Sequence, residues 1–182
     1  MARLILLDRD GVINLDSPAY IKDADEWVPI PGALEAIARL KRAGWLVGVC
    51  SNQAGIGRGI LTEAGLQRVH RRMAQRLAEH GAALDGLRYC PHHPDEGCSC
   101  RKPAPGMLLS LMAELNAEPE QTLFVGDQLK DMAAARAAGC RPVLVRTGHG
   151  AASEAAARAE GVICVADDLA ALAEHLLEGT PC

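Results

Sequence analysis

Short apolar runs alternate with longer amphipathic stretches along most of this chain, and this alternation limits the folds that it can adopt. The expected strands cover residues 4–7, 46–50, 87–89, 122–125, 143–145 and 162–165. The expected helices cover residues 32–43, 62–80, 105–116, 129–138, 154–160 and 168–177, and the alanine-rich stretch 151–159 is also expected to be helical. Because the strand runs carry no polar alternation, each strand should be buried on both faces. The pattern predicts an α/β fold with a Rossmann-like, doubly wound parallel sheet and helices on both faces.

A single domain is the simplest organisation for this sequence. The chain has 182 residues, and it contains no linker, internal repeat or low-complexity segment. We therefore expect one domain over residues 1–182, without a large cap inserted after Asp10 or Ser51. No run of about 18 apolar residues occurs, and two carboxylates follow the first apolar run, so neither a membrane helix nor a signal peptide is expected. The predicted location is the cytoplasm.

Charge and aromatic content argue against two classes of ligand. The 19 Lys and Arg residues against 23 Asp and Glu residues give a net charge of −4, which argues against nucleic-acid binding through bulk positive charge. Aromatic residues make up only 3%, which argues against stacking platforms for bases or sugar rings. Any phosphate must instead meet a few placed cations, helix N-termini or a metal ion. We expect a monomer whose partner is a small molecule, with no membrane or nucleic-acid partner.

Polar side chains occur at the point where several of the expected strands end. In chain order these residues are Asp8, Asp10, Ser51, Asn52, Gln53, Asp127 and Asp131. The carboxyl ends of parallel strands meet at one edge of a sheet, and open α/β sheets bind their ligands there. The sequence therefore predicts one polar site at this edge.

The first strand ends in two carboxylates that lie close together. Asp8 and Asp10 are two residues apart, so both can project from the same face of the chain, and Gly11 lets the backbone turn away behind them. Two carboxylates this close repel each other unless a cation lies between them or one stays protonated. Either arrangement is useful, because one acid can attack or bind a metal while the other carries a proton.

Three further segments supply groups that a phosphate ligand needs. Ser51 and the backbone N–H groups that follow it form a donor set suited to phosphate oxygens. Arg101 and Lys102 place two positive charges just before the helix expected from residue 105. Asp127 and Asp131 offer carboxylates for a hard cation such as Mg²⁺.

Cysteine and histidine residues gather in one short segment, residues 90–100. Their spacing, C-x-H-x5-C-x-C, fits a tetrahedral Zn²⁺ site. The predicted ligands are Cys90, His92, Cys98 and Cys100. His93 is an alternative to His92. Four protein ligands leave no position for water, so the predicted zinc is structural, and we expect it to fix Arg101 and Lys102 at the mouth of the site.

The remaining cysteines carry no metal-binding pattern. The chain has seven cysteines, and Cys50, Cys140, Cys164 and Cys182 are scattered along it. Such uneven spacing argues against a disulfide scaffold. We expect these residues to be small buried hydrophobic side chains or, for Cys182, part of a frayed terminus.

In this order and spacing, the polar segments resemble the four motifs of the haloacid dehalogenase superfamily of phosphotransferases, over essentially the whole chain. The resemblance implies that Asp8 is a nucleophile that forms an aspartyl phosphate, and that Asp10 is the general acid and base. It implies that Ser51 and Lys102 hold the phosphoryl oxygens. It also implies a Mg²⁺ ion held by Asp8, Asp127 and the backbone carbonyl of Asp10. A phosphomonoester dianion repels a carboxylate nucleophile, so Mg²⁺ and Lys102 would neutralise charge before attack.

Longer stretches resemble the zinc-containing members of that superfamily that act on a bisphosphorylated sugar. They are SNQAGIGRGILTEAG, YCPHHP, CRKPAPGMLL, GDQLKDMAAA and VLVRTGHG. The resemblance implies a Mg²⁺-dependent phosphatase of such a sugar. The expected substrate contacts are Asp16, Tyr20, Asn52, Gln53, Arg58, Arg101 and Gln128. The alternative is a histidinol-phosphate phosphatase of histidine biosynthesis, because the zinc loop is short.

Two readings from other classes explain less of the sequence. A binding module would use the zinc loop as a docking patch, but it leaves Asp8, Asp10, Lys102 and Asp127 without a role. A receiver domain also forms an aspartyl phosphate on a parallel sheet, but it is shorter, takes its phosphate on a later strand and needs no zinc. Turnover of an aryl phosphate that depends on Mg²⁺ and Asp8 separates an enzyme from both.

Overall fold

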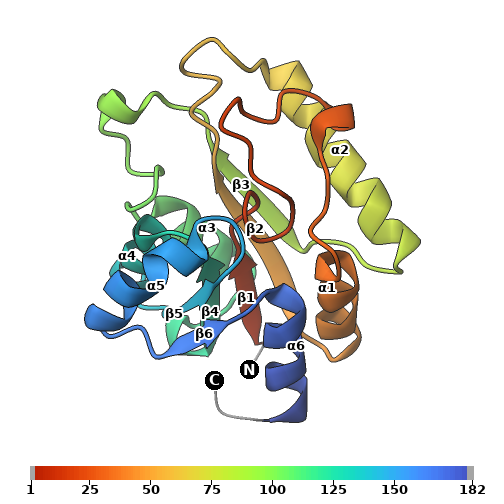
Figure 1. Ribbon diagram of the computed structural model, residues 1–182, viewed down its shortest axis with the longest axis vertical. Coiled ribbons are helices and arrows are strands. Elements are labelled where there is room, and N and C mark those ends of the chain that lie inside the picture. The colour runs from red at the N-terminus through yellow and green to blue at the C-terminus, as the bar shows by residue number, and fades with distance from the viewer. Residues whose placement is uncertain (1–2, 180–182) are drawn as a thin grey trace.

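The computed structural model describes residues 3–179, so the prediction for Cys182 lies outside the described residues. Its centre is a six-stranded sheet in which all neighbouring strands pair in parallel (Figure 1). The strands are β1 Leu4–Leu7, β2 Leu46–Asn52, β3 Gly86–Cys90, β4 Thr122–Gly126, β5 Arg141–Val145 and β6 Cys164–Ala166. Their order across the sheet is β3-β2-β1-β4-β5-β6. This order confirms the predicted doubly wound parallel sheet.

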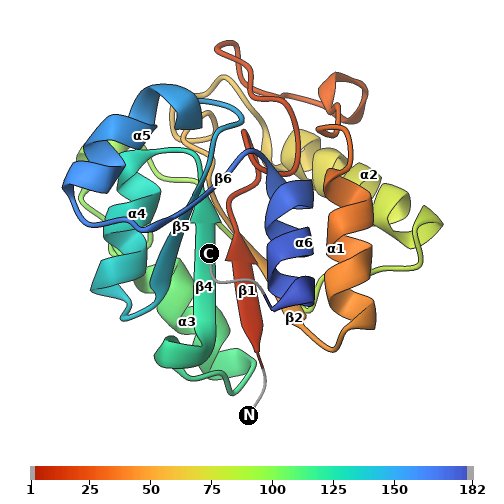
Figure 2. The same cartoon turned by 60° about the horizontal axis from the view of Figure 1, so that its bottom comes forward.

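In the described part of the chain, six α-helices cover the two faces of the sheet. They are α1 Ala33–Arg42, α2 Glu63–Glu79, α3 Gly106–Glu114, α4 Leu129–Ala137, α5 Gly150–Ala159 and α6 Leu169–Glu178. The helices α1, α2 and α6 lie on one side, and α3, α4 and α5 lie on the other (Figure 2). Three 3₁₀-helices, at Ala24–Glu26, Pro94–Glu96 and Pro119–Gln121, were not predicted. Between residues 3 and 179, no helix has the length and apolar character needed to cross a bilayer.

The central strand β1 shows why its sequence is an unbroken apolar run. All four of its side chains are fully buried. Ile5 and Leu7 pack into the core that α1, α2 and α6 share with the sheet. Leu4 and Leu6 pack into the core beneath α3 and α4. Successive side chains of a strand point to opposite faces, so a strand covered by helices on both faces requires an apolar residue at every position. Full burial of each such side chain contributes about 1.5–3 kcal/mol to the free energy of unfolding.

The structure differs from the sequence prediction at the ends of several elements. The strand β2 continues to Asn52, because β3 pairs with it as far as Asn52 opposite Cys90. Ser51 and Asn52 are therefore the last residues of the strand, not the start of a loop. The strand β5 begins two residues early because Arg141 and Pro142 pair with β4, although neither side chain carries a strand signal. The helix α5 covers the alanine-rich stretch and starts four residues before the predicted residue 154.

Candidate active site

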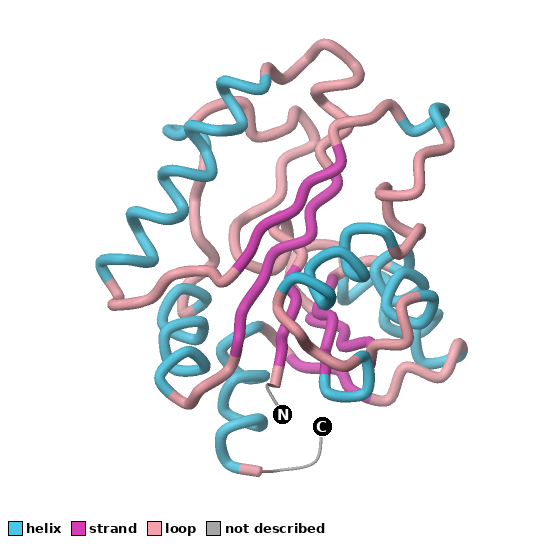
Figure 3. Tube along the Cα trace, turned by 180° about the vertical axis from the view of Figure 1, so that it is seen from behind, coloured by secondary structure: helices cyan, strands magenta, loops and turns pink. Residues whose placement is uncertain are grey.

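Four of the seven polar residues at the strand ends, Asp8, Asp10, Asn52 and Gln53, line one cleft at the carboxyl edge of the sheet, and Ser51, Asp127 and Asp131 do not line it. The strands β2, β1 and β4 are neighbours, and the loops that follow the strands gather at one end of the molecule (Figure 3). The cleft has a volume of about 190 Å³. It is lined by Asp8, Asp10, Asp16, Ser17, Pro18, Tyr20, Ile21, Asn52, Gln53, Gln128 and Lys130. Five of the seven predicted substrate contacts are in this lining, and Arg58 and Arg101 are not.

A buried lysine lies between two carboxylates, one of which, Asp8, lines the cleft. The Nζ atom of Lys102 is 2.9 Å from Asp8 Oδ1 and 2.8 Å from Asp131 Oδ1. Burial alone would lower the pKa of Lys102, but the charges of Asp131 and Asp8 outweigh it and raise that pKa. Lys102 is therefore a fixed cation, and Asp8 is the partner that also faces the cleft.

Three carboxylates come together around the same point. Oxygen atoms of Asp8, Asp127 and Asp131 all lie within 4.8 Å of one another. Burial raises the pKa of Asp8 to about 7, an effect that Lys102 offsets in part and the neighbouring carboxylates reinforce. Burial likewise raises the pKa of Asp127 to about 6. So many buried acids at one point need a cation, and hard oxygen ligands of this kind suit Mg²⁺.

The carboxylate of Asp127 has one oxygen fixed and one oxygen unused. Its Oδ2 atom accepts a hydrogen bond of 2.8 Å from the backbone N–H of His149. Its Oδ1 atom is buried and has no hydrogen-bond donor among residues 3–179. Gly11 and Gly148 pack against the carboxylate with φ of +83° and +58°, and a Cβ atom on either would collide with it. This cradle leaves Oδ1 available to a metal ion, so the residues fit the Mg²⁺ that the sequence predicts.

Asp10 lies beside this cluster, but its carboxylate is not one of the three that converge. It accepts hydrogen bonds from Arg9 Nε (2.9 Å) and Arg9 Nη2 (3.2 Å). Asn14 Nδ2 (2.9 Å) and Gln53 Nε2 (3.2 Å) also donate to it. Burial would raise the pKa of Asp10, but the charge and hydrogen bonds of Arg9, with those of Asn14 and Gln53, lower it. The Asp10 side chain is thus a hydrogen-bonded carboxylate outside the acid cluster, and it must take up a proton before it can act as a general acid.

The end of β2 contributes two kinds of contact. Gln53 Nε2 donates to Ser51 Oγ at 2.7 Å, which orients the hydroxyl of that buried serine. Asn52 forms a reciprocal pair with the backbone of Lys102: Nδ2 donates to its carbonyl (3.1 Å) and Oδ1 accepts from its N–H (3.0 Å). Asn52, a predicted substrate contact, therefore also fixes the segment that carries Lys102.

The four predicted zinc ligands lie close together in the loop after β3. His92 Nδ1 is 3.4 Å from the Sγ of Cys90 and 3.2 Å from the Sγ of Cys100. The Sγ of Cys98 is 3.5 Å from those of both Cys90 and Cys100. Such distances are close to the edges of a tetrahedron around Zn²⁺ with Zn–S bonds of about 2.3 Å. The ligand atoms therefore fit a structural zinc site.

His93, the alternative ligand, is used differently. Its Nδ1 atom accepts a hydrogen bond of 3.2 Å from the N–H of Asp95, which begins the short helix Pro94–Glu96. The zinc loop also contacts the segment after β2, because Gly57 N–H donates to the carbonyl of Pro91 at 2.8 Å. The loop thus contacts the segment after Gln53 and leads directly into Arg101 and Lys102.

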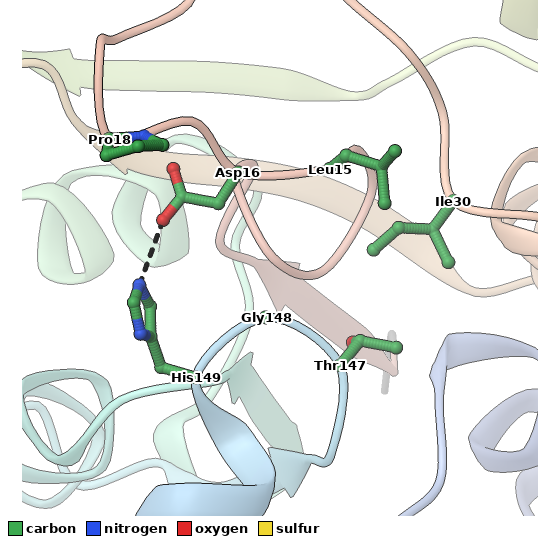
Figure 4. A pocket seen from close by; sticks show the side chains of 7 residues that line it. All are labelled: Leu15, Asp16, Pro18, Ile30, Thr147, Gly148 and His149. Carbon is green, nitrogen blue, oxygen red and sulfur yellow. Dashed lines mark hydrogen bonds and ion pairs between the residues drawn. The ribbon is translucent and has the colours of Figure 1, made fainter.

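A second, more apolar pocket of about 600 Å³ adjoins the cleft (Figure 4). Its lining is Leu15, Asp16, Pro18, Ile30, Thr147, Gly148 and His149. Asp16 and Pro18 also line the acid cleft. The Nε2 atom of His149 lies 3.1 Å from Asp16 Oδ2, so the loop after β1 and the loop after β5 meet at the boundary between the two spaces.

The structure places two charged residues that the sequence offered only as candidates, and it adds one residue that the sequence did not indicate. Lys130 lines the cleft, and Asp131 joins the acid cluster from the first turn of α4. The spacing of four residues between Asp127 and Asp131 is the signal for the latter. Arg9 is fully buried, and no sequence signal identified it, because an arginine is normally exposed.

Comparison with known proteins gives a consistent set of relatives. Residues 99–172 match the HAD-hydrolase-like family. A D-glycero-beta-D-manno-heptose-1,7-bisphosphate 7-phosphatase of Pseudomonas aeruginosa is 50% identical over 175 residues, which are 96% of this chain and 98% of the relative. The phosphatase of the same name from Bordetella bronchiseptica is 46% identical, over 97% of this chain and 98% of the relative.

Solved structures agree with these sequence matches. The crystal structure of a D,D-heptose 1,7-bisphosphate phosphatase from B. bronchiseptica, complexed with magnesium and phosphate, has a TM-score of 0.93 at 45% identity. The match covers 97% of this chain and 99% of that one. The D,D-heptose 1,7-bisphosphate phosphatase from Burkholderia thailandensis has a TM-score of 0.73 at 40% identity, over 96% and 98% of the two chains.

Proposed function

Because this chain belongs to the HAD-like phosphatases, in the family of the D-glycero-beta-D-manno-heptose-1,7-bisphosphate 7-phosphatases, we propose that it removes the C7 phosphate of that heptose bisphosphate. One relative with that name is 50% identical to this chain over 96% of its length. The observation that carries the proposal is that such a chain also places a buried Asp8–Lys102–Asp131 cluster at the carboxyl edge of the sheet. The product, heptose 1-phosphate, would serve the synthesis of lipopolysaccharide-heptose precursors.

The proposed reaction has two displacement steps at phosphorus. The carboxylate of Asp8 attacks the C7 phosphorus, the bond from phosphorus to the sugar oxygen breaks, and Asp10 gives its proton to the leaving alkoxide. An aspartyl phosphate and heptose 1-phosphate result. Asp10 then takes a proton from a water molecule that attacks the phosphorus, which releases inorganic phosphate and restores Asp8. Ser51 and Lys102 would bind the phosphoryl oxygens during both steps.

Two metal ions belong to this proposal. Asp8, Asp127 and the backbone carbonyl of Asp10 would hold Mg²⁺, with Asp131 beside them. When bound, Mg²⁺ supplies positive charge that neutralises the phosphate and the nucleophile. A similar protein was crystallised with magnesium and phosphate, which supports this part of the proposal. Cys90, His92, Cys98 and Cys100 would hold a structural Zn²⁺.

The alternative, a histidinol-phosphate phosphatase, is not favoured by the comparisons, because relatives at 43–50% identity carry the heptose name. A side-by-side measurement of kcat/KM on heptose 1,7-bisphosphate and histidinol phosphate tests the proposal. We expect the bisphosphate to be the better substrate, with the C1 phosphate left intact. A higher kcat/KM on histidinol phosphate would overturn the assignment.

Lys130 offers a test of how the second phosphate of the substrate is bound. It is a cation in the lining of the cleft, and the predicted contact Arg101 has a buried Nη1 without a hydrogen-bond partner among the described residues. Lys130→Met and Arg101→Ala are each expected to lower kcat/KM for the bisphosphate about tenfold or more, because a hydrogen bond between charged groups contributes roughly 1.5–3 kcal/mol. Both should change kcat/KM for p-nitrophenyl phosphate much less, because that ester has no second anion.

The matched control is Arg72→Met, on the exposed surface of α2 and outside the cleft. It should leave both substrates unchanged. Equal losses on both substrates in the Lys130 and Arg101 variants would mean that these cations serve only the transferred phosphate.

Magnesium affinity should depend steeply on pH. In the metal-free site, the pKa values of Asp8 and Asp127 are raised to about 7 and about 6, so both acids hold protons below those values. Mg²⁺ must displace these protons, so its affinity is highest above pH 7 and falls as the pH drops. The loss should reach about tenfold per unit between pH 7 and pH 6 and more below pH 6. Calorimetric titration in two buffers of different ionisation enthalpy measures the affinity and the protons released. A dissociation constant that stays flat from pH 5.5 to pH 8 would contradict this expectation.

A further inference from the structure

A fully buried arginine separates the two acids of the first motif. Arg9 lies between Asp8 and Asp10 in the sequence, and its side chain has no exposed surface. An arginine is almost never buried so completely unless each face of the guanidinium has a partner. Two of its nitrogens, Nε and Nη2, donate to the carboxylate of Asp10. The third nitrogen, Nη1, makes neither of these two hydrogen bonds.

The partner of Nη1 is a histidine from another layer of the fold. His70 lies in α2, and its Nε2 atom is 3.3 Å from Arg9 Nη1. Its ring packs 5.7 Å from the ring of Tyr89 in β3. Burial and the charge of Arg9 lower the pKa of His70 to about 4, so at neutral pH the imidazole is uncharged. Arg9 can only donate, so Nε2 accepts and the proton of the imidazole is on Nδ1.

We propose that His70 is a positioning residue for catalysis: it fixes the guanidinium of Arg9, which holds the carboxyl group of Asp10 where it can protonate the leaving group. The inference rests on the proposed function, because it requires a reaction in which Asp10 transfers a proton. His70 itself contacts neither Asp10 nor the acid cluster of Asp8, Asp127 and Asp131, and acts through Arg9.

The geometry explains why this third contact matters. Two parallel hydrogen bonds fix Asp10 relative to the guanidinium plane, but they do not fix the plane itself. The contact from His70 holds the guanidinium at a third nitrogen, Nη1. His70 lies in α2, a helix of 17 residues whose first turn is capped by Thr62. Asn14 and Gln53 also donate to Asp10, so loss of His70 should displace the carboxyl group without releasing it. Misplacement of a catalytic group by about 1 Å can cost as much as 10²-fold in rate.

The leaving group distinguishes this role from a purely structural one. An alkoxide is a poor leaving group and needs the proton from Asp10, whereas p-nitrophenolate leaves readily without it. A change that only weakens the fold lowers the rates on both esters together. A change that misplaces Asp10 lowers kcat/KM selectively on the alkyl ester, because kcat/KM reports the departure of the leaving group and not the later hydrolysis of the aspartyl phosphate, in which Asp10 acts as a base for both esters.

The experiment compares two amide variants, His70→Gln and His70→Asn, on an alkyl phosphate and on p-nitrophenyl phosphate. The Gln side chain is long enough to place its carbonyl oxygen near the position of Nε2, and the Asn side chain is one methylene shorter. We expect His70→Asn to lower kcat/KM for glycerol phosphate or the heptose bisphosphate about tenfold or more, with kcat/KM for p-nitrophenyl phosphate changed less than about threefold. His70→Gln should stay within about threefold of the wild type on both.

Activity on the aryl ester in the same sample reports the fraction of correctly folded enzyme. Equal losses on both esters, or equal behaviour of the Gln and Asn variants, would overturn the role of His70. The comparison needs one alkyl and one aryl ester only. A wild-type enzyme that prefers histidinol phosphate would therefore overturn the proposed function, and the result for His70 would still stand on its own.

Discussion

Asp8→Asn is expected to abolish turnover while the fold survives. The amide has the same shape as the carboxylate, but it cannot attack phosphorus, so no aspartyl phosphate can form. Loss of a nucleophile from a cooperating catalytic group costs on the order of 10⁴-fold or more in kcat. Lys102 keeps its contact with Asp131, so its charge remains paired in the variant. Turnover of p-nitrophenyl phosphate with saturating Mg²⁺ measures the effect, and circular dichroism checks the fold.

The matched control for this variant is Asp95→Asn. Asp95 is an acid in the zinc loop whose side chain is 90% exposed, and it is outside the lining of the cleft. This change should leave turnover close to that of the wild type. If purified Asp8→Asn retains more than a few per cent of the activity, the mechanism through a covalent intermediate on Asp8 is wrong.

Loss of zinc is expected to have the largest effect on stability. Structural Zn²⁺ in small sites contributes about 10–16 kcal/mol of apparent binding free energy, and most of it is available only when the ligands are brought together. His92→Ala removes one ligand of the cluster, so it should lower the zinc content and reduce Tm by about 10 °C or more, since each kcal/mol corresponds to roughly 2–4 °C in a domain of this size. Activity should fall as well, because the loop leads directly into Arg101 and Lys102.

His93→Ala is the control within the same loop. His93 caps the helix Pro94–Glu96 and lies outside the group of converging ligand atoms, so this variant should keep about one Zn²⁺ per chain and most of its activity. Metal analysis and thermal unfolding measure both variants. A zinc-free protein with an ordered loop and full activity would rule out the assignment of a structural zinc site.

The fold could be predicted from the sequence because its signal is distributed over many residues. Six apolar runs separated by amphipathic segments specify a parallel sheet, and β1 contributes two side chains to each of the two cores as that pattern requires. The exceptions are local. Arg141 and Pro142 enter β5 through their pairing with β4, and nothing in their own chemistry shows this.

The site could be predicted only as far as strand ends determine it. Asp8, Asp10 and Asp127 follow strands, so the sheet itself brings them to one edge. The direction of a side chain in a loop depends on backbone angles that spacing does not reveal. This is why Lys130 was not among the predicted contacts, while Arg58 was predicted as a contact and is exposed outside the cleft.

Contacts between distant segments were the least predictable part. Lys102 and Asp131 are 29 positions apart, and Arg9 and His70 are 61 apart, so neither pair has a local signal. Both pairs are buried, and a buried charge must have a partner. Sequence reasoning can state that requirement, but only the packing of α2 and α4 against the sheet shows which residue fulfils it.

The glycines around Asp127 have a consequence for ion selectivity. A carboxylate that touches backbone on two sides cannot retreat to admit a larger ion. Ca²⁺ binds oxygen at about 2.3–2.6 Å and accepts irregular surroundings, whereas Mg²⁺ requires about 2.0–2.1 Å and near-octahedral order. Gly11 and Gly148 would then favour Mg²⁺ over the larger Ca²⁺, although neither residue offers a ligand atom from a side chain.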